Sequence, residues 1–156
     1  TAAIHALEAH LILFNTGQAR NASDIAIEQI KNTADKSREL HQMRAMVDVA
    51  EKILTSTPVR FADFGALLHD AWQLKRTLSA KITNSFIDDI YSRARSAGAL
   101  GGKLLGAGGG GFMMIFAPPA LHEKIKKTVA LPHVPFKFEQ EGSKVIFEMP
   151  VDNFEV

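Results

Sequence analysis

The chain has 156 residues, of which 46% are hydrophobic and 22% charged, a composition typical of one packed globular domain. Its 18 basic and 17 acidic residues give a net charge of +1, which excludes the strongly positive field expected of a protein that binds nucleic acid or an anionic membrane. The absence of cysteine excludes disulfides, a thiolate nucleophile and thiolate zinc sites, and it is compatible with the cytoplasmic location that we expect.

Neither a metal site nor a membrane segment is predicted. The six histidines show no helical i, i+4 pair of the kind that binds a metal ion. No apolar run approaches the roughly 20 residues that span a bilayer, and no basic-then-apolar leader stands at the N-terminus.

The first half of the chain predicts a helix, a strand and a long helical region. Helix 2–10 precedes the apolar run Leu11–Phe14, which is typical of a central strand buried on both faces. A helix capped by Asn21 or Ser23 follows. Its apolar stripe shifts near residues 35–37, so it is either one kinked helix or two, and Pro58 ends it.

The second half predicts three more helices and three strands. Helices are expected at Ala62–Leu78, at Ser85–Ala97 with Ser85 opening a capping box, and at 120–130. The apolar run 112–117 is expected as a strand, and Phe136–Glu139 and Lys144–Met149 as a hairpin.

This order of elements predicts the α+β class. We expect a mostly antiparallel four-stranded sheet with helices over one face, forming one domain over residues 1–156.

One loop concentrates five of the 11 glycines within six residues. It consists of Gly106, Ala107, Gly108, Gly109, Gly110 and Gly111. Glycine contributes little apolar surface but permits positive φ, so such a loop serves close backbone approach. Two interpretations stay open: convergent N–H groups that face a phosphate, or tight packing against another element.

Two well-known phosphate motifs do not fit this loop. The dinucleotide fingerprint needs a strand before the glycines and a helix after them, whereas here a helix precedes and a strand follows. A Walker loop ends in Gly-Lys-Ser/Thr, but here Leu104 follows Lys103 where the hydroxyl residue should be. The spacing from Gly98 to Lys103 is also one residue shorter than the motif requires.

Four segments together resemble a known family. Residues 103–112, KLLGAGGGGF, are similar to the third conserved motif of the GHMP small-molecule kinases. Residues 13–20 (LFNTGQAR), 64–75 (FGALLHDAWQLK) and 97–103 (AGALGGK) resemble the branch of D-glycero-D-manno-heptose kinases and fucokinase-type domains. The resemblance covers most of residues 7–118.

The resemblance implies a ferredoxin-like GHMP kinase C-terminal domain with extra helices. It implies transfer of the γ-phosphoryl of ATP, with Mg²⁺, to a sugar or sugar phosphate, with the glycine loop beside the nucleotide phosphates. The catalytic residues and the glycine-serine phosphate loop belong to an N-terminal domain in the family. No such segment stands in this sequence, which starts inside a predicted helix, so we expect the C-terminal domain alone, inactive by itself. The expected partners are its own N-terminal domain and the substrate, and a homodimer is left open.

Two side chains of the helix at 62–78 are candidates for binding the substrate. A helical wheel places Lys75 in the apolar stripe and Trp72 on its flank. Lys75 extends along the apolar surface to water, pairs with another group of the protein, or faces a ligand. In the last case its ammonium meets a substrate phosphate while the indole stacks on the sugar.

Two further basic residues are substrate-site candidates. Arg20 precedes a helix N-terminus, where an anion is favoured, and is otherwise a solvated turn residue. Lys103 precedes the glycine loop and either approaches the phosphates or is a charge at a strand edge. We expect Asp88 and Asp89 to be first-turn helix acids.

Two alternatives to a sugar kinase remain. The chain is otherwise a non-catalytic α+β binding or regulatory module, in which the glycine loop serves packing. The third hypothesis is a GHMP kinase for an isoprenoid precursor or an amino-acid alcohol.

Overall fold

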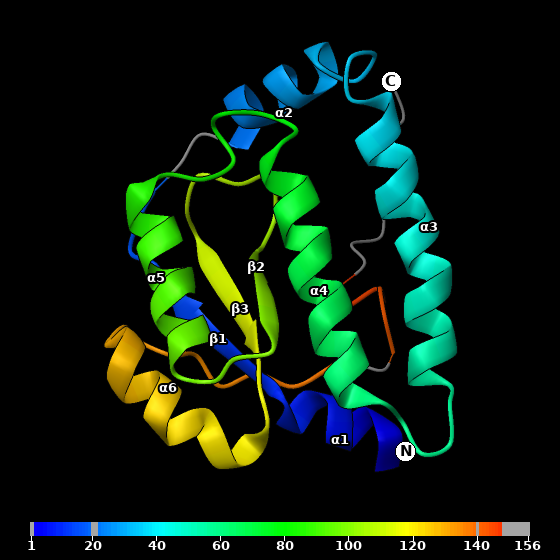
Figure 1. Cartoon of the computed structure of the whole chain (residues 1–156), viewed down its shortest axis with the longest axis vertical. Helices are drawn as coiled ribbons and strands as arrows, with labels where there is room; N and C mark the ends of the chain where they lie inside the picture. The colour runs from blue at the N-terminus through cyan, green and yellow to red at the C-terminus, as the bar shows by residue number, and fades with distance from the viewer. Residues whose placement is uncertain (1, 20–21, 140, 148–156) are drawn as a thin grey trace, which may run out of the picture.

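The computed structural model describes residues 2–19, 22–139 and 141–147, and the statements below concern this part of the chain. Figure 1 shows helices packed around a small sheet, which confirms the α+β class. In chain order the elements are α1 (Ala2–Ala9), β1 (Leu11–Asn15), α2 (Ala22–Lys31), α3 (Ser37–Leu54), α4 (Phe61–Arg76), α5 (Ser85–Ser96), β2 (Gly101–Leu104), β3 (Phe112–Phe116), a 3₁₀ turn (Pro119–Leu121) and α6 (His122–Val129).

The sheet has three strands in the order β1-β3-β2, and both pairings are antiparallel. Strand β3 is central, with Asn15 opposite Phe112 at one end and Leu11 opposite Phe116 at the other. The glycine loop joins β2 to β3 at the Asn15 end. The register therefore brings the end of β1 beside the loop.

The prediction that β1 is a central strand buried on both faces is wrong. It lies at the edge of the sheet, and its burial alternates, with Ile12 and Phe14 facing the core. The segment after α6 forms hydrogen bonds with the outer side of β1. The Pro132 carbonyl accepts from the Asn15 amide, and the Val134 amide donates to the Leu13 carbonyl. The short apolar run resembled a central strand because period two is hard to see over four residues.

The predicted four-stranded sheet is corrected in two places. Strand β2 was not predicted, since Gly101-Gly102-Lys103-Leu104 lacks the β-branched and aromatic residues that mark strands. The predicted hairpin does not form in the described residues, since neither 136–139 nor 144–147 is a strand, and the rest of it lies outside them. An isolated two-stranded hairpin is marginal in water without an apolar face to pack on.

Two details of the helices also differ from expectation. The stripe shift near residue 35 separates two helices, α2 and α3, which decides the open alternative. The cap of α5 is Asn84 rather than Ser85, because the Asn84 side chain accepts the Ile87 amide at 3.0 Å. The cap thus lies one residue before the predicted position.

The core lies between the sheet and the helices. Alternate residues of β1 and β3 join side chains of α5 and α6 in one buried cluster. Its members include Ile12, Phe14, Met113, Ile115, Ile87, Ile90, Tyr91, Ile125 and Val129. Met113 and Tyr91 are therefore core residues, and Met114 is half-buried. None of the described helices is long and apolar enough to cross a membrane.

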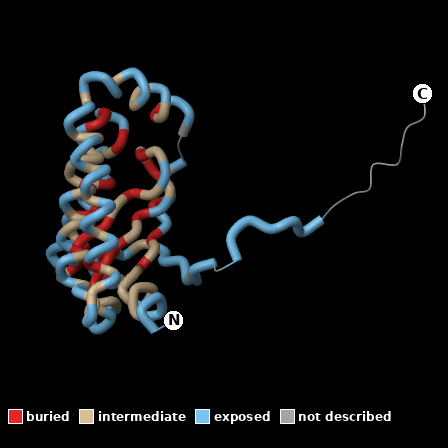
Figure 2. The backbone as a smooth tube through the Cα atoms, turned by 90° about the vertical axis from the view of Figure 1, so that its right-hand side faces the viewer, coloured by how far each residue is buried: buried red, intermediate tan, exposed pale blue. Residues whose placement is uncertain are grey.

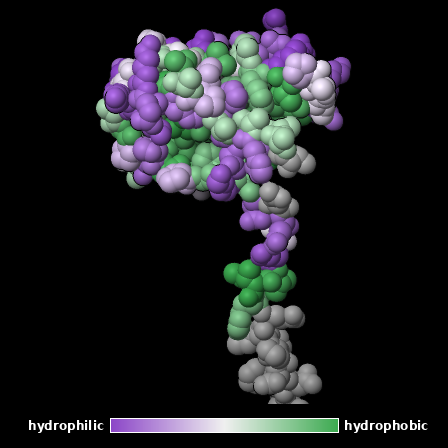
Figure 3. All heavy atoms as spheres, turned by 90° about the horizontal axis from the view of Figure 1, so that it is seen from below, coloured by the Kyte–Doolittle hydropathy of each residue, from purple (hydrophilic) through white to green (hydrophobic). Residues whose placement is uncertain are grey.

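The last described segment extends away from the body of the molecule (Figure 2). Val145, Ile146 and Phe147 are 80%, 88% and 78% exposed, and Figure 3 shows this apolar stretch standing clear of the remaining surface. Closer to the body the chain is held by Glu8, which accepts from Lys137 at 2.6 Å and from the Phe138 amide at 3.0 Å. These hydrogen bonds lower the pKa of Glu8 below its ordinary value.

Helix α4 packs directly on β2 through two glycines. A Cβ at Gly101 would lie 2.2 Å from the Gly65 carbonyl oxygen, and one at Gly65 would lie 2.4 Å from Leu100 Cβ. The backbones of the helix and the strand are therefore in contact, which fixes the place where α4 crosses the sheet.

We expect Gly101→Ala to lower the free energy of unfolding by about 1–3 kcal/mol, because the added methyl group overpacks a backbone contact. Urea unfolding measures the change. Ala66→Ser, at an exposed position of α4, is the control and should change stability by less than about 0.5 kcal/mol. An unchanged unfolding midpoint for Gly101→Ala would show that the helix and strand separate without cost.

Candidate functional site

The glycine loop adopts backbone conformations that other residues rarely take. Gly106, Gly108, Gly109 and Gly111 have φ values of +71°, +125°, +73° and +88°. Non-glycine residues pay a steric cost in this region, so the sequence of the loop follows from its backbone path.

Three segments of the chain approach the loop closely, because its glycines have no side chains. A Cβ at Gly108 would lie 2.7 Å from the Ile82 Cα, and one at Gly110 would lie 2.6 Å from the Gln18 carbonyl oxygen. At Gly109 it would lie 2.7 Å from the Ile25 side chain of α2. The loop is thus in close contact with residues 16–18, with α2 and with the segment between α4 and α5.

Hydrogen bonds hold the loop to the same segments. The Gly109 amide donates to the Ile82 carbonyl at 2.8 Å, and the Gly111 amide donates to Gln18 at 3.1 Å. The Gly111 carbonyl accepts from the Thr16 hydroxyl at 2.8 Å. Because two of its amides bond protein carbonyls, the loop is not a complete phosphate cradle. Close packing is confirmed, and contact with a phosphate stays a prediction.

Lys75 lies at the start of the loop. Its ammonium group donates to the Gly106 carbonyl at 2.6 Å and to the Leu104 carbonyl at 3.3 Å. The side chain is half-buried and links α4 to the end of β2. This arrangement corresponds to the pairing alternative, because the ammonium group bonds backbone carbonyls. A substrate phosphate would meet a cation already held at the loop.

The structure places Trp72 in the core rather than on an accessible flank. The residue is 1% exposed, and its ring centroid lies 6.2 Å from that of Tyr91 on α5. Stacking on a sugar needs an open indole face, which this position does not give. The helical wheel could not show that α5 covers the flank, because it represents one helix without its neighbours.

The remaining predicted residues are placed as follows. Lys103 is half-buried in the edge strand β2, opposite Met114, three residues before the loop. Arg20 lies outside the described residues. In the described part of the chain, no group of three histidine, aspartate or glutamate side chains forms that could hold a metal ion. We therefore assign no Mg²⁺ ligand to these residues.

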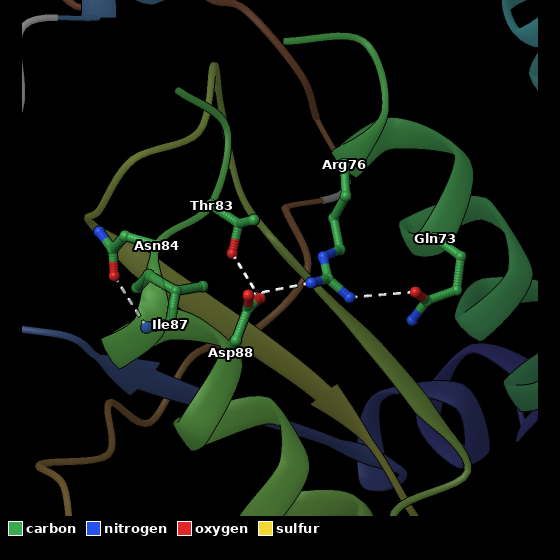
Figure 4. Close-up of polar contacts among 6 residues, drawn as sticks. All are labelled: Gln73, Arg76, Thr83, Asn84, Ile87 and Asp88. Atoms are coloured by element: carbon green, nitrogen blue, oxygen red, sulfur yellow. Dashed lines mark hydrogen bonds and ion pairs between the residues drawn. The ribbon is translucent and has the colours of Figure 1, made fainter. Parts of the chain in front are cut away.

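A polar network next to the loop was missed by the sequence reasoning (Figure 4). Asp88, in the first turn of α5, binds the Arg76 guanidinium at 2.9 Å and accepts from the Thr83 hydroxyl at 2.7 Å. Arg76 also donates to Gln73 at 3.1 Å. The acid at 88 was expected only as a favourable charge at a helix N-terminus, and nothing in the sequence pairs it with the last residue of α4.

Helix α2 holds the same region from the other side. Glu28 accepts from the Ser79 hydroxyl at 2.5 Å and binds the Lys81 ammonium at 2.9 Å. The Ser79 hydrogen bond, followed by that of Lys81, lowers the pKa of Glu28 below its ordinary value. Gln29 reaches the loop itself and donates to the Ala107 carbonyl at 2.7 Å.

A cavity of about 580 Å³ lies elsewhere, between α1, α6 and residues 133–137. It borders the Leu11 end of β1, whereas the glycine loop lies at the Asn15 end. The cavity is therefore separate from the glycine loop and its surroundings.

Comparison with known families agrees with this geometry. Residues 59–131, which include the glycine loop, match the family described as GHMP kinases C terminal. The chain contains a GHMP kinase C-terminal domain. The three-stranded antiparallel sheet and its helices are consistent with that domain, although it has one strand fewer than expected.

Two curated relatives and one solved structure show the likeness. The chain is 33% identical over 144 residues to the D-glycero-alpha-D-manno-heptose 7-phosphate kinase of Campylobacter jejuni, covering 88% of the chain and 42% of the relative. It is 28% identical to the mevalonate kinase of Thermococcus gammatolerans, and the alignment covers 72% of the chain and 35% of that relative. The crystal structure of L. major mevalonate kinase in complex with R-mevalonate superposes with a TM-score of 0.67 at 21% identity. The superposition covers 77% of this chain and 37% of that structure's chain. The chain thus spans less than half of the length of each of these proteins.

We expect Lys75→Met to lower the free energy of unfolding by about 1.5–3 kcal/mol, because two backbone carbonyls lose a charged donor. Urea unfolding is the measurement. Lys124→Met, at an exposed position of α6, is the matched control and should change stability by less than about 0.5 kcal/mol. Equal values for both variants would contradict a structural role of Lys75.

Burial raises the pKa of Tyr91, the only tyrosine in the chain, to about 12. Because the phenol of Tyr91 loses its proton at a higher pH in the folded state than in the unfolded state, the folded protein retains its full free energy of unfolding below pH about 10. It then falls by about 1.4 kcal/mol per pH unit between pH about 10 and about 12. Titration of tyrosinate absorbance should give a midpoint near 12 in the folded protein and near 10 in denaturant. A folded-state midpoint near 10 would mean that the phenol is open to water.

Proposed function

We propose that this chain is the C-terminal, substrate-side domain of an ATP-dependent sugar kinase. The reaction is transfer of the ATP γ-phosphoryl to a hydroxyl of a sugar or sugar phosphate, with a heptose or heptose phosphate as the first candidate. The domain acts with its own N-terminal kinase domain and is inactive alone, because the catalytic residues are expected there. ATP and Mg²⁺ are cofactors of the complete enzyme.

The observation that carries this proposal is the sequence identity to the heptose 7-phosphate kinase. It reaches 33% over 88% of the chain, compared with 28% over 72% for the Thermococcus gammatolerans mevalonate kinase. The higher identity favours a sugar phosphate over mevalonate.

The geometry of the loop suits one wall of a phosphoryl-transfer site. Such transfer depends on positioning and on neutralising charge, with little covalent chemistry for the protein. A loop of glycines lets phosphates approach the backbone closely, and Lys75 places a positive charge at its start. Lys103 and Arg20 remain candidates for contact with a substrate phosphate.

Mevalonate is the second candidate substrate. It is supported by the 28% identity to the Thermococcus enzyme, whereas the superposition on the L. major enzyme speaks for the fold alone. A non-catalytic binding module is the third possibility, supported by the close packing of the glycine loop.

An ATP-consumption screen of the full-length protein tests the proposal. The panel contains heptose 7-phosphate, free heptose, fucose, galactose and mevalonate. We expect a kcat/KM for heptose 7-phosphate about 100-fold or more above that for mevalonate, because a site built to bond a substrate's polar groups rejects analogues that lack them. The isolated chain of residues 1–156 should consume no ATP.

Two results would contradict it. Preferred turnover of mevalonate would assign the enzyme to the isoprenoid branch. No ATP consumption with any acceptor, from folded full-length protein, would favour the binding module.

A further inference from the structure

The segment between α4 and α5, residues 77–84, forms one side of the glycine loop. The Ile82 carbonyl accepts the Gly109 amide at 2.8 Å, and the Ile82 backbone lies in the space that a side chain at residue 108 would fill. The Lys81 carbonyl oxygen lies 3.3 Å from the Cβ position of Gly109. A shift of this segment would therefore move the loop or leave a gap beside it.

One carboxylate joins both ends of that segment. Asp88 binds Arg76, the last residue of α4, and Thr83, near the end of the segment, at 2.9 and 2.7 Å. Figure 4 shows the three side chains converging between the two helices, with Asn84 capping α5 beside them. The Arg76 and Asp88 side chains are only 30% and 38% exposed, so water and salt screen this pair less than an open surface pair.

We propose that Arg76, Thr83 and Asp88 are positioning residues for the glycine loop. They fix residues 77–84 so that the Ile82 carbonyl meets the Gly109 amide, and they thereby set the wall that the loop presents to the phosphates. The effect on catalysis rests on the proposed function, whereas the effect on the loop does not. Binding groups reach the needed precision when surrounding hydrogen bonds hold them in place.

The chain provides a matched control on the same helix. Asp89 binds Arg93 at 2.9 Å, but Arg93 reaches the carbonyls of Thr128 and Val129 at the end of α6, away from the loop. Asp89→Asn and Asp88→Asn thus make the same chemical change one residue apart, and only Asp88 contacts the segment beside the loop.

The test is hydrogen exchange measured by mass spectrometry on the full-length protein, following a peptide that covers residues 106–111. Asp88→Asn should speed exchange of the loop about tenfold, because a charged pair that keeps the segment closed is lost. Asp89→Asn should leave it unchanged. With an active enzyme, Asp88→Asn should also lower kcat/KM about tenfold while the melting temperature stays above that of the assay.

Thr83→Val is the milder second variant, since it removes one hydrogen bond and retains the ion pair. It should speed loop exchange by a smaller factor, about threefold, and it decides the matter if Asp88→Asn does not fold. Loop exchange equal to wild type in the folded variants would overturn the proposal, whatever the kinetics. Faster loop exchange in a protein that consumes no ATP would support the positioning role and contradict the proposed function alone.

Discussion

The absence of side chains along the glycine loop lets three separate segments of the chain meet at one place. The backbones of residues 16–18 and of the 77–84 segment approach the loop at distances that a single methyl group would prevent, and the Ile25 side chain of α2 lies 2.7 Å from the Cβ position of Gly109. Each approach is accompanied by a hydrogen bond to the loop, from Gly109 and Gly111 or to Ala107. The position of the candidate site therefore depends on backbone contacts, and packed backbones deform little.

The small sheet provides the fixed base for this arrangement. Helix α4 crosses β2 at Gly65 and Gly101, and the same helix carries Lys75 and Arg76 to the level of the loop two to three turns later. One end of α4 is thus fixed by close packing, and the other end holds the loop through charged hydrogen bonds. Because α4 is held at both ends, it fixes the position of the loop relative to the sheet.

The charged groups near the loop are used mainly on the protein itself. Lys75 bonds loop carbonyls, Arg76 bonds Asp88, and Lys81 bonds Glu28. This pattern supports a wall that is ordered before any ligand arrives, in which the cost of fixing the loop is met within the domain. In the proposed kinase, the second wall and the reacting groups belong to the N-terminal domain.

The sequence alone determined the helical regions, the family resemblance and the place of the glycine loop, because periodicity and glycine content are local properties. The buried position of Trp72, the pairing of β2 and the Arg76–Asp88 contact were decided by tertiary structure. Each depends on which element lies opposite, and neither a helical wheel nor the composition of a strand contains that information. The predicted hairpin failed for the same reason: the apolar run Val145–Phe147 forms a strand only when another surface covers it.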